Sequence, residues 1–291
     1  MKRIFSIFLI LSLLGAVALG EWDCPKCGRS NDDAYAFCPA CGSESVPPWV
    51  CPNCSNENEG NFNFCTFCGS AKPVEWVVGN TVTFGTYGGV AIEWEIMEEK
   101  PDGNYVLLSK YGLDAKPYNE EAAFVTWETC TLRAWLNGKF YQTAFTAEEK
   151  NRICLTDVVN ADNAEYGTKG GSDTQDYVYL LSLDEVQKYY GAYLREVECY
   201  DCCEELICQP TAFAVSRGAY QFSQSEIGDY QSYLDYPLQA GAGWWWLRST
   251  GSSFYHAASV YYVGAVITRD SSIDRDDLMV RPVVVVRSTS F

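Results

Sequence analysis

Apolar and polar residues alternate in several short segments of the C-terminal two thirds of the chain. In residues 90–96 every second residue is apolar, which is the two-residue period of a strand with one buried face. Residues 101–104 read Pro-Asp-Gly-Asn, a turn composition, and the apolar run 105–109 follows them. The pattern predicts a β-hairpin over residues 90–109.

Helix signals come next along the chain. Thr146 stands three residues before Glu149, and Ser182 stands three residues before Glu185. In each pair the hydroxyl and the carboxylate can satisfy the exposed amides at a helix start, which forms a capping box. Two helices are therefore predicted, and the second is expected to run to about residue 194.

A further helix is expected over residues 131–136, because Asn137 and Gly138 form a natural C-terminal stop. Apolar runs then predict strands over residues 177–181, 244–248, 258–263, 264–267 and 280–286. Pro282 predicts an edge or an irregular start for the last of them. Together these elements predict one α+β domain over residues 71–291.

The first twenty residues have the pattern of a secretory signal peptide. Lys2 and Arg3 precede an apolar run that ends in small residues around Ala16, Ala18 and Gly20. The alternative is an uncleaved membrane anchor, since the run is near the lower limit for spanning a bilayer. Either reading predicts an extracytoplasmic protein, secreted or at the cell surface, whose only contact with a membrane would be an uncleaved anchor.

A 27-residue repeat follows the signal segment. Two pairs of cysteines with Cys-x-x-Cys spacing occur in residues 21–44, and two more occur in residues 45–70. This spacing is typical of zinc ribbons, with the ligands Cys24, Cys27, Cys38, Cys41 and Cys51, Cys54, Cys65, Cys68. Tyr35 and Phe37 are expected to cover the metal of the first ribbon.

The repeat predicts two structural zinc ions. Each tight turn can aim two sulfurs at one point, and four thiolates close the site to a catalytic water. A unit of this size buries too little surface to fold without its metal. Disulfides, favoured by an oxidising compartment, and iron are the alternatives at this point.

Charge limits the partners. The 291-residue chain carries 21 Lys+Arg against 38 Asp+Glu, for a formal charge of −17. The segment between Glu21 and Trp76 contains eight acidic and three basic residues. Each zinc ion bound by four thiolates adds further negative charge. Nucleic acid is therefore excluded as a partner, because the chain lacks a basic stripe for a phosphate backbone.

Six blocks of the large domain carry a resemblance to a known family. They include Trp-Glu-Thr-Cys-Thr-Leu-Arg-Ala-Trp-Leu-Asn at 127–137, Trp-Trp-Leu-Arg-Ser at 245–249 and Val-Arg-Pro at 280–282. The chain resembles a family of uncharacterised bacterial domains that follow zinc ribbons. That family is distantly similar to C-type-lectin-like domains, whose irregular α+β fold is shared with formylglycine-generating enzymes. The resemblance implies this fold for residues 71–291. The calcium-lectin sugar motif is absent, since Gln209-Pro210-Thr211 is the nearest string.

Two segments are candidates for special chemistry. A cysteine cluster in the large domain is expected to form one or two structural disulfides, with metal binding as the alternative: Cys199, Cys202, Cys203 and Cys208. A loop with amphipathic rings and carboxylates is expected to bind a ligand, with a packed loop as the alternative: Tyr230, Tyr233, Asp235 and Tyr236.

Other unusual residues have a structural interpretation. Trp244, Trp245 and Trp246 are expected to lie in the core, where Arg248 and Arg281 pair with carboxylates such as Asp176. Cys130 and Cys154 are expected to be small buried groups.

No catalytic residue is predicted, because the single histidine, His256, has no nucleophile in a suitable setting. The acids between residues 270 and 277 lack the spacing of a calcium loop. We expect a secreted binding protein for a protein or glycan. The alternatives are an extracellular hydrolase or oxidase on the same scaffold and a purely structural surface spacer.

Overall fold

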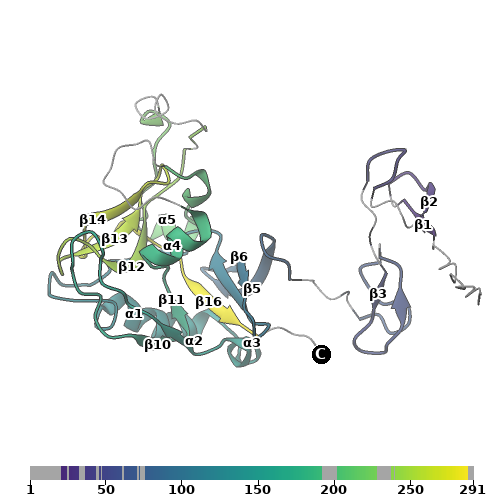
Figure 1. Cartoon of the computed structure of the whole chain (residues 1–291), viewed down its shortest axis with the longest axis horizontal. Helices are drawn as coiled ribbons and strands as arrows, with labels where there is room; N and C mark the ends of the chain where they lie inside the picture. The colour runs from purple at the N-terminus through teal and green to yellow at the C-terminus, as the bar shows by residue number, and fades with distance from the viewer. Residues whose placement is uncertain are drawn as a thin grey trace, which may run out of the picture. The chain divides into compact units, whose positions relative to one another are not determined.

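The computed structural model describes residues 21–24, 26–32, 37–43, 46, 48–60, 62–70, 72, 76–191, 202–227, 237–238 and 240–287. The predicted signal peptide, residues 1–20, lies outside them. The chain divides into two compact units, with the division between residues 75 and 76. Each unit is described by itself (Figure 1).

The N-terminal unit contains two small antiparallel pairs of strands. Strand β1 (Glu21–Asp23) pairs with β2 (Ser30–Asp32), and β3 (Trp49–Val50) pairs with β4 (Glu57–Asn58). Each pair joins the two sides of the first Cys-x-x-Cys turn of its repeat. Two copies of one local structure therefore arise from the two copies of one sequence pattern.

The large unit is built on two five-stranded sheets. The first has the order β11-β16-β7-β6-β5 and is antiparallel throughout. Its strands are β5 (Thr81–Tyr87), β6 (Val90–Glu99), β7 (Tyr105–Ser109), β11 (Val178–Tyr179) and β16 (Val283–Val286). The predicted hairpin is the pair β6 and β7. Ile92, Trp94 and Ile96 are buried as their alternation predicts, whereas Val90 is exposed because it adjoins the turn after β5.

The second sheet has the order β14-β13-β12-β15-β8. Its strands are β8 (Asp114–Ala115), β12 (Trp245–Thr250), β13 (His256–Val260), β14 (Val266–Ser272) and β15 (Met279–Val280). Only the pair β12 and β15 is parallel among these described strands. A separate pair joins β9 (Thr156–Val158) to β10 (Thr174–Asp176).

The segment 279–286 links the two sheets. It pairs as β15 in the second sheet and then as β16 in the first, with Arg281 and Pro282 between them. The single strand predicted over residues 280–286 is therefore divided. The interruption falls at Pro282, which has no N–H to give to a strand partner.

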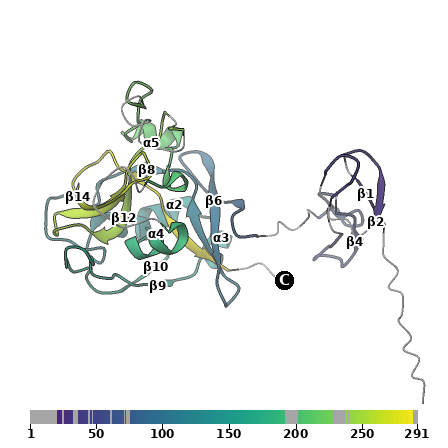
Figure 2. The ribbon, with the colours of Figure 1, turned by 45° about the horizontal axis from the view of Figure 1, so that its top comes forward.

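Short helices flank the sheets (Figure 2). They are α1 (Thr131–Trp135), the π-helical turn η1 (Leu136–Phe140), α2 (Tyr141–Ala144), α3 (Ala147–Arg152), α4 (Leu183–Tyr190), the 3₁₀ turn η2 (Glu204–Leu206) and α5 (Ala212–Ser216). Both predicted capping boxes are present, at α3 and at α4. Helix α4 ends at Tyr190 and lies against β12, and Gly191 forms its left-handed cap.

The predicted helix stop at Asn137 is wrong. The chain continues through η1 into α2, and the Asn137 side chain bonds to backbone groups across the bulge. Its amide nitrogen donates to the Arg133 and Val178 carbonyls, and its oxygen accepts from the N–H of Tyr177 at 2.8 Å. A side chain that satisfies neighbouring backbone groups in this way allows a wider helical turn.

Candidate metal centres and surface sites

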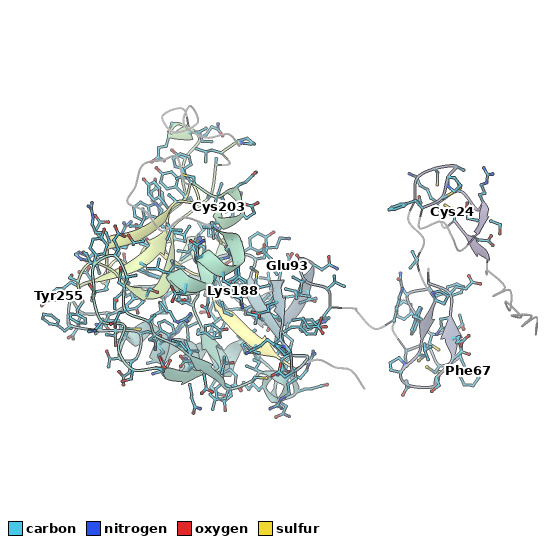
Figure 3. The ribbon with its side chains drawn as sticks, viewed as in Figure 1. Cys24, Phe67, Glu93, Lys188, Cys203 and Tyr255 are labelled. Atoms are coloured by element: carbon cyan, nitrogen blue, oxygen red, sulfur yellow. The ribbon has the colours of Figure 1, made fainter. Side chains whose placement is uncertain are left out.

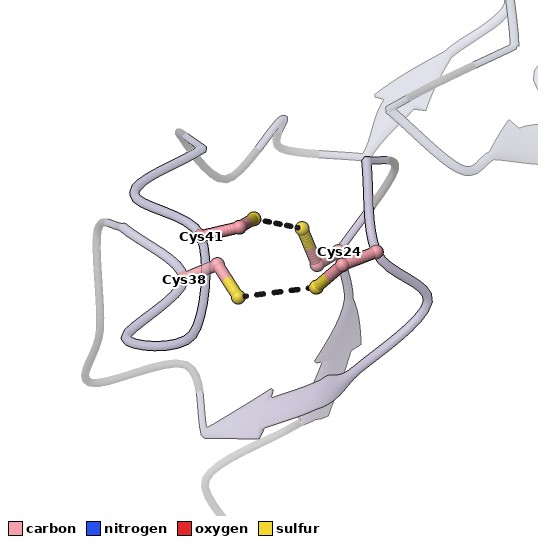
Figure 4. A group of neighbouring side chains, drawn as sticks. Cys24, Cys38 and Cys41 are labelled. Carbon is pink, nitrogen blue, oxygen red and sulfur yellow. Dashed lines mark hydrogen bonds between the residues drawn. The ribbon is translucent and has the colours of Figure 1, made fainter.

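Two groups of four sulfurs are the clearest sites in the described part of the chain. In the first ribbon, Cys24 Sγ lies 3.4 Å from Cys41 Sγ and Cys27 Sγ lies 3.7 Å from Cys38 Sγ (Figure 4). The second ribbon repeats this arrangement at 3.5 Å for both cross-pairs, which are Cys51 with Cys68 and Cys54 with Cys65. In each group the sulfurs all lie within 4.8 Å of one another.

The turn geometry explains why the sulfurs converge. After the first cysteine of each pair the chain forms a tight turn, in which the N–H four residues on bonds to the cysteine carbonyl, as from Gly28 to Cys24 at 2.8 Å. The residue after the second cysteine then has a positive φ. That residue is Gly28, Gly42, Ser55 or Gly69. Glycine is favoured there because it has no Cβ to clash.

The sulfur spacing fits zinc. A tetrahedral ion with bonds of about 2.3 Å to sulfur separates its ligands by about 3.8 Å. The Ser43 hydroxyl lowers the pKa of Cys41 to about 6, and Ser70 lowers the pKa of Cys68 to about 5. In the same tetrads backbone hydrogen bonds lower the pKa of Cys27 and of Cys54, but burial and hydrogen bonds to neighbouring sulfurs outweigh them and raise it to about 12. The metal is thus indicated by the convergence of the four sulfurs and not by these shifts. Both tetrads are therefore structural zinc sites with no open position for catalysis.

Phe37 does not cover the metal of the first ribbon, contrary to the prediction from the sequence. Phe37 is 57% exposed, and Phe67, within a cysteine knuckle, is 79% exposed (Figure 3). Tyr35 lies outside the described residues. In the second ribbon Trp49 is the buried ring instead, and its indole N–H donates to the Phe62 carbonyl at 3.0 Å.

A fully buried carboxylate, Asp176, connects the block 127–137 to β10. It accepts bonds from Trp127 Nε1 at 2.9 Å, Arg133 Nε at 2.6 Å, Thr174 Oγ1 at 2.7 Å and Asn137 Nδ2 at 3.1 Å. Three residues of the block 127–137, namely Trp127, Arg133 and Asn137, thus converge on one acid. Their role is to fix α1 and η1 against β10.

The two buried arginines have other partners than the sequence predicts. Arg248 forms an ion pair with Glu185 of the α4 capping box, and Arg281 bonds to Glu95 at 3.1 Å. Asp176 pairs with Arg133 instead. The structural role is confirmed, but the partner is wrong, because the pairing depends on which strands become neighbours in the folded sheets.

The predicted core tryptophans are confirmed at two positions. Trp245 and Trp246 are fully buried, and their N–H groups bond to the carbonyls of Leu206 and Lys116. Trp244 is half-buried, with the Arg275 guanidinium 4.4 Å from its ring centre.

The predicted disulfides are not found in the described residues. Cys203 and Cys208 are free thiols, and Cys202 is bonded to neither of them. Cys203 Sγ lies 3.0 Å from Glu205 Oε2, and Cys208 is buried against the Lys110 carbonyl. The 3₁₀ turn between them directs the two side chains to different neighbours. Cys199 lies outside the described residues.

The two remaining cysteines of the large domain differ. Cys130 is buried, as predicted, and burial raises its pKa to about 12. Its sulfur also caps α1 by accepting from Arg133 N. Cys154 is only half-buried.

A cleft of about 340 Å³ opens between strands β6 and β7 and the segment around η2. Its charged lining is Glu95, Lys110 and Glu204, and its uncharged lining is Tyr111, Ile207, Gln209 and Pro237. Glu93, which pairs with Lys110, and Cys203, next to Glu204, mark this region in Figure 3. These residues come from four separate segments, so no spacing in the sequence could have identified them together.

A second surface feature is aromatic. The Phe124 ring lies 4.7 Å from that of Tyr255 and 5.6 Å from that of Phe254. Phe124 is 69% exposed and Tyr255 is 41% exposed (Figure 3). His256 beside them bonds to Ser253 Oγ at 3.0 Å within one turn. This contact is local, and the described structure adds no third group that would orient the imidazole for catalysis.

The last two segments are the candidate ligand loop and the acidic stretch of residues 270–277. The candidate loop with Tyr230, Tyr233, Asp235 and Tyr236 lies outside the described residues. The acids around residue 274 form local contacts, such as the bidentate pair of Arg275 with Asp277. Among the described residues, clusters of three or more potential metal ligands occur at the two cysteine tetrads alone.

Fold and sites together define a protein with two structural zinc ribbons followed by a mixed α/β domain. The sequence signature of the double zinc ribbon family matches residues 24–69. A second family, described as a domain of unknown function (DUF6273), matches residues 102–288, which is more than half of the chain. The chain belongs to this family.

No curated protein and no solved structure matches the chain. Within the described residues, no helix has the length and apolar character needed to cross a membrane.

Proposed function

We propose that the protein is an exported recognition protein whose large domain binds a neutral glycan in the cleft between β6, β7 and η2. The observation that carries the proposal is the lining of that cleft, which combines two carboxylates, one amide, one phenol and one ammonium group with apolar Ile207 and Pro237. A sugar presents both hydroxyl groups and apolar C–H faces, so it needs this mixture.

Electrostatics favours a neutral sugar over an acidic one. Two carboxylates and one ammonium leave the cleft lining with one negative charge, and the whole chain carries −17. Anionic ligands are repelled by such a surface. Glu95 is held by Arg281 and Lys110 by Glu93, so these groups are positioned before any ligand arrives.

A C-type-lectin-like architecture is part of this proposal. Two small, mainly antiparallel sheets linked through residues 279–286, with short helices at their edges, support it. The zinc ribbons would then serve as a metal-stabilised spacer or docking module ahead of the recognition domain.

The test is a binding screen with neutral and acidic oligosaccharides, followed by calorimetric titration of the full chain. Glu204→Gln and Tyr111→Ala should each weaken binding about tenfold or more, because each removes a group that faces the cleft. Glu205→Gln is the matched control, since Glu205 bonds to Cys203 and does not line the cleft. Absence of neutral-glycan binding, or binding that survives both cleft substitutions, would overturn the proposal.

Export has its own test. The Lys2-Arg3 start and the apolar run up to residue 20 support a cleaved signal. In a secreting bacterial host, mass spectrometry of the product should show a chain that begins near Glu21. A product that retains residues 1–20 in the cytoplasm would contradict export.

A protein ligand is the second candidate, and the aromatic cluster of Phe124, Phe254 and Tyr255 favours it. Surface rings from two distant segments that contact one another, here in tilted pairs with Phe124 and Tyr255 exposed, are typical of protein interfaces. Phe124→Ser should leave glycan binding unchanged and abolish a protein interaction at this surface, as measured with an isolated partner.

A further inference from the structure

The two zinc ribbons differ at one buried hydrogen-bonding position. Asn31 and Asn58 are equivalent in the repeat, and both are buried. Each donates its amide N–H to the carbonyl two residues earlier, Asn31 to Arg29 at 2.8 Å and Asn58 to Asn56 at 3.0 Å. This half of the arrangement is the same in the two ribbons.

The hydrogen bonds accepted by the side-chain oxygens of Asn31 and Asn58 differ between the two ribbons. Asn58 Oδ1 accepts the backbone N–H of Thr66 at 2.9 Å, the Thr66 hydroxyl at 3.0 Å and the Asn56 amide at 3.2 Å. Asn31 Oδ1 is buried and has no hydrogen-bond partner among the described residues. The cause is in the sequence, because Pro39 stands where Thr66 stands in the second ribbon, and proline has neither an N–H nor a hydroxyl.

Two of these missing bonds, from the Thr66 N–H and hydroxyl, join the two halves of the metal site. The third, from Asn56, stays beside the first knuckle. Asn58 follows the first knuckle of its ribbon, and Thr66 lies inside the second knuckle. Asn53 adds a second link of this kind, because its amide donates to Ser70 Oγ at 3.2 Å. Lys26 is the equivalent residue of the first ribbon and has no side-chain amide.

We propose that the first ribbon is an exchangeable zinc site and that the second ribbon holds its zinc permanently. In the first ribbon the two knuckles lack the hydrogen bonds between Asn and Thr that join the knuckles of the second ribbon. Fewer bonds must therefore break before the first tetrad opens locally. A buried acceptor without a partner also makes the closed state less favourable. As the ribbon opens, Cys24, Cys27, Cys38 and Cys41 take up protons from solvent while a stronger chelator takes the divalent ion.

One feature of the second ribbon acts in the opposite direction. Ser55 has a φ of +58°, where the first ribbon has Gly28. A non-glycine residue in this region is strained. The three hydrogen bonds to Asn58 Oδ1 stabilise the second ribbon by more than the strain at Ser55 destabilises it. Loss of hydrogen bonds around a metal site, outside the ligands themselves, typically changes metal affinity about 10–100-fold.

The test follows zinc release from the full chain with a colorimetric chelator, 4-(2-pyridylazo)resorcinol. We expect two phases of one equivalent each, with rates that differ about tenfold or more. Cys24→Ala should remove the fast phase and leave the slow one. Pro39→Thr should slow the fast phase, and Thr66→Pro should accelerate the slow phase.

Thr66→Val is the matched control, because it keeps the backbone N–H and removes only the hydroxyl. Its effect should be smaller than that of Thr66→Pro. Release of both equivalents at one rate would overturn the proposal, as would a fast phase that survives in Cys24→Ala or is unaffected by Pro39→Thr. None of these outcomes depends on whether the cleft binds a glycan.

Discussion

Removal of the Asp176 carboxylate should destabilise the large domain strongly. Asp176 is fully buried, and its four hydrogen-bond donors include the Arg133 guanidinium at 2.6 Å and the Trp127 indole. Losing one partner of a buried ion pair costs about 3–5 kcal/mol. Because the Arg133 side chain is 24% exposed, loss of this ion pair should cost an amount near the lower end of that range. The unpaired indole N–H of buried Trp127 adds about 1 kcal/mol to the cost.

We therefore expect Asp176→Ala to lower the free energy of unfolding by about 4 kcal/mol, a large fraction of the stability of a typical domain. The measurement is urea unfolding of the zinc-loaded full chain, followed by tryptophan fluorescence. Asp162→Ala is the control, because Asp162 pairs with Lys169 at the exposed surface, and its midpoint should not change. A shift for Asp176→Ala as small as that of the control would refute the structural role assigned to this acid. The double variant Arg133→Met, Asp176→Leu should recover part of the loss, since it leaves no unpaired charge.

Three further predictions concern the metal, the backbone and pH. Chelation of both zinc ions should unfold the ribbons while the urea midpoint of the large domain stays unchanged, as measured by tryptophan fluorescence and metal analysis. Gly264→Ala should cost about 2–3 kcal/mol, because the residue has a φ of +77° and a Cβ there would lie 2.0 Å from the Cys203 carbonyl oxygen. Gly103→Ala, with a similar φ and open space, should cost about 1 kcal/mol in the same urea assay. Burial alone would raise the pKa of Glu149, but backbone N–H bonds from Thr146 and Gly85 outweigh it, so the pKa is lowered. Its contribution is then fully present above the unfolded value of about 4.3 and is lost as the pH falls through the folded pKa. Glu149→Gln should flatten the acid side of the stability profile, whereas the exposed neighbour substitution Glu148→Gln should not.

Features that depend on neighbours in the chain were predictable. The capping boxes at Thr146 and Ser182 require only a hydroxyl and a carboxylate three residues apart, and both form. The same holds for the cysteine knuckles, whose spacing is enough to bring two sulfurs to one point. Alternation along β6 identified its buried face except at Val90, which adjoins the turn after β5 and is exposed.

Features that depend on long-range pairing were predicted incompletely. The sequence indicates that Arg248 and Arg281 need carboxylates, but it does not show that Glu185 and Glu95 supply them. The helix stop at Asn137 looked complete from local residues alone. Contacts with β10 and β11, about 40 residues further on, convert it into a bulge.

By itself, the sequence determined the two zinc tetrads, the mixed α/β character of the large domain and the local caps of its helices, because each depends on a pattern in one short segment, the longest being the separation of 17 residues between the first and last cysteine of a ribbon. The tertiary structure alone decided the convergence of four donors on Asp176 and the composition of the cleft. These depend on which distant segments become neighbours. That choice is made by the packing of the whole core, and no short pattern encodes it.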